Sequence, residues 1–299
     1  MKLCALDVVW YDLPIEKRLK RIADLGFDGV ECWLNAAEWG FKVEREWPES
    51  HSVNRMTMSK KEMAKMVEDF GLEIPACGQY QIMGPMTVLG PTEVLKGEAK
   101  KARMDDIKGL ISHCAEIGAK YMISESGGDP DSAEQWKDLV EWMNELVHHA
   151  EKENVIIAME NTGQVLVKDD DALLRIVQEI DSKYLKACFD PCNDMFPAGK
   201  DLLKAVRKLR DYIAIVHAKD GVIGPGPMGM HPDGTWHCPP IGLGSVPWTL
   251  LLDTFKEIGY DGYFVIEYSY PFRAMTLEER EIGVMQGKKL LEEWWGRQA

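Results

Sequence analysis

The chain has 299 residues, of which 45% are hydrophobic, and its formal net charge is −14 at pH 7. This length suits one large α/β barrel or two smaller domains. The negative charge argues against nucleic acid as a partner, because nucleic-acid binding depends on clustered Lys and Arg. We therefore expect a small-molecule ligand.

The sequence contains no signal for a membrane or for export. Apolar runs stay below the roughly 18 residues that a membrane-spanning helix needs, and residues 1–10 resemble a strand and lack a basic leader. The seven cysteines are an odd number and are scattered along the chain, which favours reduced thiols over disulfides. We expect a soluble cytoplasmic protein without a membrane partner. The composition leaves a homo-oligomer open.

Strand-like and helix-like segments alternate eight times. We expect strands at residues 3–9, 29–34, 72–77, 121–124, 155–159, 185–189, 213–217 and 263–266. We expect helices at residues 14–25, 59–70, 98–117, 132–153, 170–180, 201–209, 247–258 and 277–295. No linker, repeat or change in composition separates these units, so the pattern predicts an α/β fold with one (β/α)₈ TIM barrel domain over residues 1–299. A doubly wound sheet is the second choice.

The connections differ between the two ends of the predicted barrel. Turns from helix to strand are short and contain glycine, whereas several loops from strand to helix are long. Long loops are uncommon without a function, and the carboxyl ends of the strands form the active face of such barrels. We expect the Gly- and Pro-rich loop at 221–245 to cover a bound substrate.

Four of the expected strands end on a side chain that can bind a metal ion. These side chains are Glu160, Asp190, His217 and Glu267. Because parallel strands deliver their carboxyl ends to one edge, we expect the four to form one site. Three carboxylates and an imidazole favour one divalent cation, Mn²⁺ before Mg²⁺, with Co²⁺ or Zn²⁺ as alternatives.

Such a site suits proton transfer on a sugar. A cation that holds a carbonyl oxygen and the neighbouring hydroxyl acidifies the C–H between them and stabilises the resulting enediolate. Glu160 and Glu267 lie on strands three apart in the expected ring, so they could flank the substrate carbon as acid and base.

Several motifs around these residues resemble one known family. The motifs are Met159-Glu160-Asn161, Phe189-Asp190-Pro191-Cys192-Asn193, His217-Ala218-Lys219-Asp220-Gly221, Ile241 to Trp248 and Gly259 to Glu267. Together they are similar to the sugar phosphate isomerase/epimerase family of xylose-isomerase-like barrels. The resemblance covers nearly the whole chain. It implies that Glu160, Asp190, His217 and Glu267 bind one divalent metal and that the two glutamates act as acid and base.

The sequence departs from this family's ketose 3-epimerases at three positions. Those enzymes carry a second Glu, a substrate-binding His and an Arg where this chain has Leu166, Asn193 and Ile223. The main hypothesis is an isomerase or epimerase acting on a ketose or keto-sugar. The alternative is a dehydratase or lyase that acts on a keto-sugar, an inosose or a 3-keto-glycoside, including C-glycoside cleavage, through the same first proton abstraction.

Other residues are candidates for contact with the substrate. They are Lys219, Asn193, Glu125, His237, His231 and Trp33. Lys219 could neutralise an oxyanion or could pair with Asp220 instead. The two loop histidines could donate a proton or face solvent, and Trp33 could stack on a sugar or pack under a loop.

Overall fold

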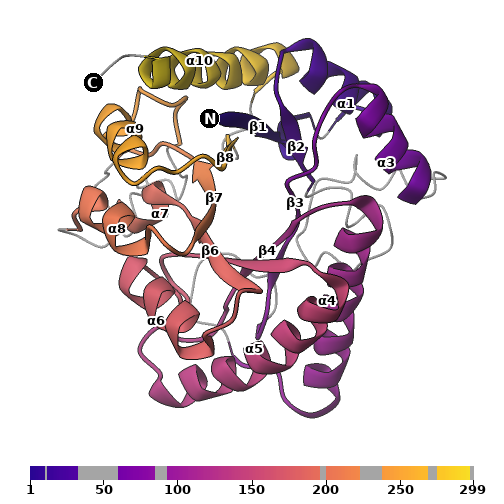
Figure 1. Ribbon diagram of the computed structural model, residues 1–299, viewed down its shortest axis with the longest axis vertical. Helices are drawn as coiled ribbons and strands as arrows, with labels where there is room; N and C mark the ends of the chain where they lie inside the picture. The colour runs from indigo at the N-terminus through magenta and orange to yellow at the C-terminus, as the bar shows by residue number, and fades with distance from the viewer. Residues whose placement is uncertain are drawn as a thin grey trace.

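The computed structural model describes residues 1–10, 12–32, 60–84, 93–195, 200–222, 238–268 and 275–296. Within these ranges, eight parallel strands alternate with helices in a nearly closed TIM barrel, which confirms the predicted fold class (Figure 1). The strands are β1 (Lys2–Leu6), β2 (Gly29–Glu31), β3 (Ala76–Gln81), β4 (Tyr121–Glu125), β5 (Ile156–Glu160), β6 (Leu185–Phe189), β7 (Ile213–Ala218) and β8 (Tyr263–Ile266).

The helices form a ring outside the strands, and a 3₁₀ helix, η1 (Asp7–Trp10), follows β1 (Figure 1). The α-helices are α1 (Ile15–Asp24), α3 (Lys60–Asp69), α4 (Gly97–Ile117), α5 (Ala133–Glu153), α6 (Asp170–Ile180), α7 (Pro191–Met195), α8 (Leu202–Leu209), α9 (Trp248–Glu257) and α10 (Leu277–Gly296). Within the described ranges, no helix is both long and apolar enough to cross a bilayer.

The order of the strands brings the two ends of the chain together. The sheet runs β2-β1-β8-β7-β6-β5-β4-β3, so the first and last strands pair with each other. Between β2 and β3 the described contacts are isolated bridges, Gly29 with Glu73 and Cys32 with Cys77. The backbone N–H of Val30 donates to the carbonyl oxygen of Glu73 at 2.9 Å, so the barrel is nearly closed at this seam.

Two separate cores follow from the alternation of side chains along each strand. Inside the barrel lies a small cluster that includes Leu6, Ile123, Ala158, Ile215 and Val265. A larger cluster fills the layer between the strands and the helices. Because side chains alternate, the residue two positions after an inner residue also faces the barrel interior. The inner residues therefore show which side chains at the strand ends point into the barrel.

Capping side chains set the starts of several helices. Ser132, Asp169 and Asp201 each accept a hydrogen bond from the backbone N–H three residues later, at 3.2, 2.9 and 3.1 Å. The helices expected at 132 and 201 therefore begin one residue later than predicted. Gly118 closes α4 at a φ of 78°, which glycine adopts without strain.

The sequence-based boundaries are least accurate in the first three strands and after β6. The third strand lies at Ala76–Gln81 instead of 72–77, because Pro75 has no backbone N–H to donate to a ladder. The end of the first expected strand is the 3₁₀ helix η1, and the second strand ends at Glu31. The short helix α7 directly after Asp190 was not predicted.

Candidate metal centre

The four predicted metal ligands come together at the carboxyl ends of adjacent strands. Glu160 is the last residue of β5, Asp190 and Glu267 directly follow β6 and β8, and His217 is the fifth residue of β7. Each offers one ligand atom, and these atoms all lie within 4.8 Å of one another. All four residues are at most 5% exposed. A single ion could therefore contact all four side chains.

The imidazole of His217 lies between the two glutamates. Its Nδ1 atom is 3.4 Å from Oε1 of Glu160 and 3.2 Å from Oε2 of Glu267. This buried nitrogen makes no hydrogen bond to any residue that the structure describes. Buried polar atoms normally have a partner, and a neutral imidazole nitrogen among carboxylate oxygens is a typical metal ligand.

Asp190 is held by the backbone around it. Its Oδ1 atom accepts hydrogen bonds from the N–H groups of Cys192 at 2.8 Å and Asn193 at 3.0 Å, at the start of α7. The side-chain amide of Asn161 donates to the backbone carbonyl oxygen of Asp190 at 2.8 Å, and its oxygen accepts from the backbone N–H of Asp190 at 2.9 Å. These contacts fix Oδ1 and direct Oδ2 towards the cluster.

Two of the expected substrate-binding residues, Lys219 and Asn193, directly contact the predicted ligands. The Lys219 ammonium lies 2.5 Å from Oδ2 of Asp190 and 3.2 Å from Oε2 of Glu267, and only 7% of the residue is exposed. The side-chain amide of Asn193 donates to Oε1 of Glu160 at 3.1 Å and to the carbonyl oxygen of Asn161 at 3.0 Å. Asn193 therefore orients Glu160.

The centre carries an excess of buried negative charge. Burial raises the pKa of Asp190 to about 7, although Lys219 opposes this shift. Burial lowers the pKa of His217, yet its neighbours, Cys188 and Glu31 foremost, raise it well above its ordinary value. Burial likewise lowers the pKa of Lys219, and Asp190 and Glu267 outweigh this effect so that the pKa is raised. A divalent cation would relieve this imbalance, so the donor set fits such an ion.

Sequence reasoning missed Glu31, which ends β2. This residue is 0% exposed, and its Oε2 atom lies 3.2 Å from Nε2 of His217. The second strand was expected to run to residue 34, which placed Glu31 in its middle. The strand register supplies the missing signal, because Glu31 pairs with Leu6 of the inner core and so faces the barrel interior.

The remaining candidates differ in how far the structure locates them. Glu125 ends β4 and is half-buried, and the pairing of Ser124 with Met159 puts it level with Glu160 on the neighbouring strand. Trp33, His231 and His237 lie outside the described residues, as do Ile223 and most of the predicted covering loop.

The structure also bears on the two roles considered for Lys219 and on the position of Leu166. Among the described contacts, Lys219 pairs with Asp190 and Glu267, and Asp220 accepts backbone hydrogen bonds instead. Leu166 is 2% exposed and belongs to the layer between strands and helices, so it supplies no polar group to the centre.

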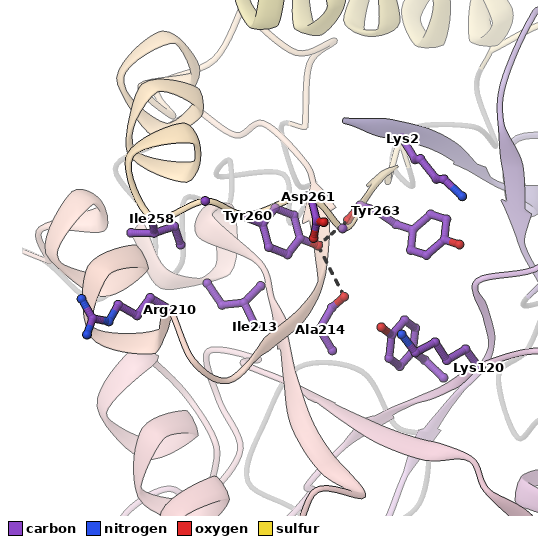
Figure 2. A pocket seen from close by; sticks show the side chains of 12 residues that line it. Lys2, Lys120, Arg210, Ile213, Ala214, Ile258, Tyr260, Asp261 and Tyr263 are labelled. Atoms are coloured by element: carbon purple, nitrogen blue, oxygen red, sulfur yellow. Dashed lines mark hydrogen bonds between the residues drawn. The ribbon is translucent and has the colours of Figure 1, made fainter.

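A hollow at the opposite mouth of the barrel is separate from this centre (Figure 2). It is lined by residues at the starts of the strands, among them Lys2, Tyr121 and Tyr263. The Tyr260 hydroxyl reaches into it and donates to the carbonyl oxygen of Tyr263 at 2.9 Å. The catalytic chemistry of such barrels belongs to the carboxyl ends of the strands, so this hollow is not the candidate site.

Residues 19–293 match the family model described as xylose isomerase-like TIM barrel. An uncharacterized protein of Methanocaldococcus jannaschii is 27% identical over 199 residues, which are 62% of this chain and 63% of that protein. This chain thus spans less than two thirds of the curated relative that it matches.

Solved structures share the same barrel over nearly the full chain. The IolI protein with a bound zinc atom has a TM-score of 0.77 at 18% identity and covers 99% of this chain and 100% of its own. The probable 3-DHS dehydratase AsbF from Bacillus anthracis has a TM-score of 0.74 at 15% identity, with 98% and 99% covered. D-psicose 3-epimerase from Clostridium cellulolyticum H10, solved with D-tagatose, has a TM-score of 0.71 at 13% identity, with 99% of each chain covered.

Proposed function

The chain belongs to the xylose isomerase-like TIM barrel family, and we propose that it is a divalent-metal-dependent isomerase or epimerase acting on a ketose or keto-sugar. The observation that carries this proposal is the convergence of Glu160, Asp190, His217 and Glu267 within 4.8 Å at the active face. Names of similar structures, an epimerase and a dehydratase among them, support an enzyme of this broad class.

We assign the cation to these four side chains, with Mn²⁺ preferred because three of the four ligands are carboxylates. When bound, such an ion polarises a carbonyl group and stabilises the negative charge that develops as the neighbouring carbon loses its proton. The donor set also accommodates Mg²⁺, Co²⁺ or Zn²⁺.

Glu160 and Glu267 are the proposed acid and base. They extend from β5 and β8, which are three strands apart in the sheet, and the His217 ring lies between them. A substrate carbon between the two carboxylates would lose its proton to one side and regain it from the other. This arrangement inverts the centre or moves the carbonyl group along the sugar.

Other side chains would hold the sugar in place. Lys219 lies beside Glu267 and Asp190, where its ammonium could neutralise a developing oxyanion. Asn193 keeps Glu160 oriented, and Glu125 lies level with Glu160 on the next strand, within the same face. From the sequence alone, Trp33, His231 and His237 are also proposed to contact the sugar.

A dehydratase or lyase is the second candidate. It is supported by the positions at which this chain differs from ketose 3-epimerases. Leu166 is a core residue, and the Asn193 amide is engaged by Glu160 and Asn161, so neither position supplies the polar group found in those epimerases. The same proton abstraction followed by loss of a leaving group from the next carbon gives an unsaturated ketone.

Exchange in heavy water separates these possibilities. Protein loaded with Mn²⁺ should be incubated in D₂O with ketoses, 3-keto sugars and inososes, and deuterium next to the carbonyl group should be followed by NMR. The proposal predicts incorporation with at least one substrate and none with metal-stripped protein. Ultraviolet absorbance of an unsaturated ketone would identify elimination, whereas absence of exchange across the panel would contradict both candidates.

A further inference from the structure

Glu31 is a buried carboxylate that the proposed reaction does not use. It ends β2, on the side of the barrel where the seam to β3 is closed only by isolated bridges among the described contacts. Its register with Leu6 directs the side chain into the barrel, and 0% of the residue is exposed. A buried carboxylate at this position costs free energy unless a partner compensates it.

One partner of Glu31 is the outer nitrogen of a proposed metal ligand, His217. Oε2 of Glu31 lies 3.2 Å from Nε2 of His217, whereas Nδ1 of the same ring faces Glu160 and Glu267 at 3.4 and 3.2 Å. A neutral imidazole carries one proton, and a carboxylate accepts but cannot donate when ionised. With a cation between Nδ1 and the two glutamates, the one ring proton lies on Nε2, where Glu31 is placed to accept it.

We propose that Glu31 is a positioning residue that fixes the ring orientation and tautomer of His217 and thereby sets the affinity of the centre for a divalent cation. The inference rests on the metal site of the proposed function. A carboxylate on the far nitrogen of a metal-binding imidazole also increases its basicity, and loss of such a partner typically weakens metal affinity by about 10- to 100-fold.

Two substitutions separate the charge of Glu31 from its ability to accept a hydrogen bond. Glu31→Ala removes both and should raise the dissociation constant for Mn²⁺ by about 10- to 100-fold, measured by competition with a chelator. Glu31→Gln keeps an acceptor oxygen and nearly the same shape, so its loss of affinity should be smaller. Circular dichroism would verify that each variant is folded.

A second measurement reports the tautomer directly. NMR of protein with ¹⁵N-labelled histidine, loaded with diamagnetic Zn²⁺ or Mg²⁺, should place the His217 proton on Nε2 and the metal on Nδ1. A cation on Nδ1 by itself leaves the proton on Nε2, so the Nε2 chemical shift should also be compared with that of Glu31→Ala. Loss of the acceptor should move this shift if Glu31 holds the Nε2 proton, and an unchanged shift would contradict the positioning role. A proton on Nδ1 would overturn the inference.

A matched control is Glu281→Gln. Glu281 is also a buried carboxylate, but it accepts its hydrogen bonds from Trp10 and Arg21, which are not among the predicted ligands. This variant should lower the melting temperature without changing the Mn²⁺ dissociation constant. If both Glu31 variants behave like this control and bind Mn²⁺ with a dissociation constant within about threefold of the parent, the positioning role is wrong. If the parent itself binds no divalent ion, the metal site fails and this inference with it.

Discussion

Glu267 is the residue at which ion binding and proton transfer can be separated. Its carboxylate contacts both Lys219 and His217 at 3.2 Å. Glu267→Gln keeps one oxygen that can bind a metal but removes the basic oxygen, so we predict that turnover falls by roughly 10² to 10⁴ in the metal-loaded variant. The measurement is net conversion of a substrate found in the exchange panel.

Glu160→Gln is the matched variant on the opposite side of the site. Each variant should retain deuterium exchange on the face that its remaining glutamate serves, and the handedness of the label would assign the two roles. If metal-loaded Glu267→Gln converts substrate at the parent rate, Glu267 is only a ligand and the two-base mechanism is wrong.

The site residues that the sequence could predict share a simple local signal. Asp190 and Glu267 each follow a short apolar strand, so their place at a strand end can be read without any distant contact. Glu31 carries no such signal, because its role depends on His217, which lies 186 positions away in the sequence. The orienting contact of Asn193 with Glu160 was equally hidden, since it requires the unpredicted helix α7.

At the scale of elements, Asp220 joins the end of β7 to the segment before α9. Its Oδ1 atom accepts from the backbone N–H groups of Gly221 and Val246, and its Oδ2 atom accepts from those of Gly242 and Gly244. The carboxylate thus holds together the two described ends of the predicted covering loop. A hydrogen bond to a charged group contributes about 1.5–3 kcal/mol.

Gly244→Ala should disrupt this connection. A Cβ atom at this position would lie 2.0 Å from Oδ1 of Asp220 and 2.7 Å from the carbonyl oxygen of Gly221, so the carboxylate must move. We predict a loss of roughly 1–3 kcal/mol in the free energy of unfolding, measured by urea denaturation. Gly296→Ala is the control, because an added Cβ there meets nothing within 4 Å. Equal stability of the two variants would contradict the structural role of Asp220.

Lys200, before α8, and Lys208, on α8, form ion pairs with Asp171 at the start of α6. The stability that these ion pairs contribute should depend on pH. Lys200, foremost, and Lys208 lower the pKa of Asp171 from its ordinary 3.8 to about 2. A depressed carboxyl pKa contributes stability above about pH 4, and this contribution is lost as pH falls towards 2. The side chain is 70% exposed, so the effect is screened by salt.

We predict that Asp171→Asn melts at a lower temperature than the parent at pH 6 and that the difference shrinks as the pH falls from about 4 towards 2. Thermal melts at several pH values, in low and high salt, provide the measurement. A difference that stays constant across this range would show that the ion pair does not contribute through the charge of Asp171.

The positions of helices and strands could be predicted where the apolar pattern is strong and where polar or glycine residues mark its ends. The strand at Leu185–Phe189, the helix at Asp170–Ile180 and the strand at Tyr263–Ile266 have the predicted bounds. The third strand was shifted because the residues before Pro75 resemble a strand but make only an isolated bridge, between Glu73 and Gly29, and the continuous ladder begins after that proline. Pairing with β4, including a register shift between Cys77 and Gln79, determines its true position.

At the scale of the whole molecule, the alternating pattern was sufficient to predict the barrel, because eight strand–helix units without a break have few other compact arrangements. Closure depends on pairing between the first strand and the last, which no local pattern encodes. The same closure brings Glu31 of β2 and His217 of β7 into contact, so the barrel has to form before the centre is complete.

The central claim is that four strand-end side chains bind one divalent cation, and metal content tests it most directly. Elemental analysis of protein purified without chelators should find about one divalent ion per chain. Added Mn²⁺ should also stabilise stripped protein, by about 2.7 kcal/mol at a free concentration of roughly 100 times the dissociation constant. Less than about a tenth of an ion per chain, with no rise in melting temperature on adding Mn²⁺, would contradict the account.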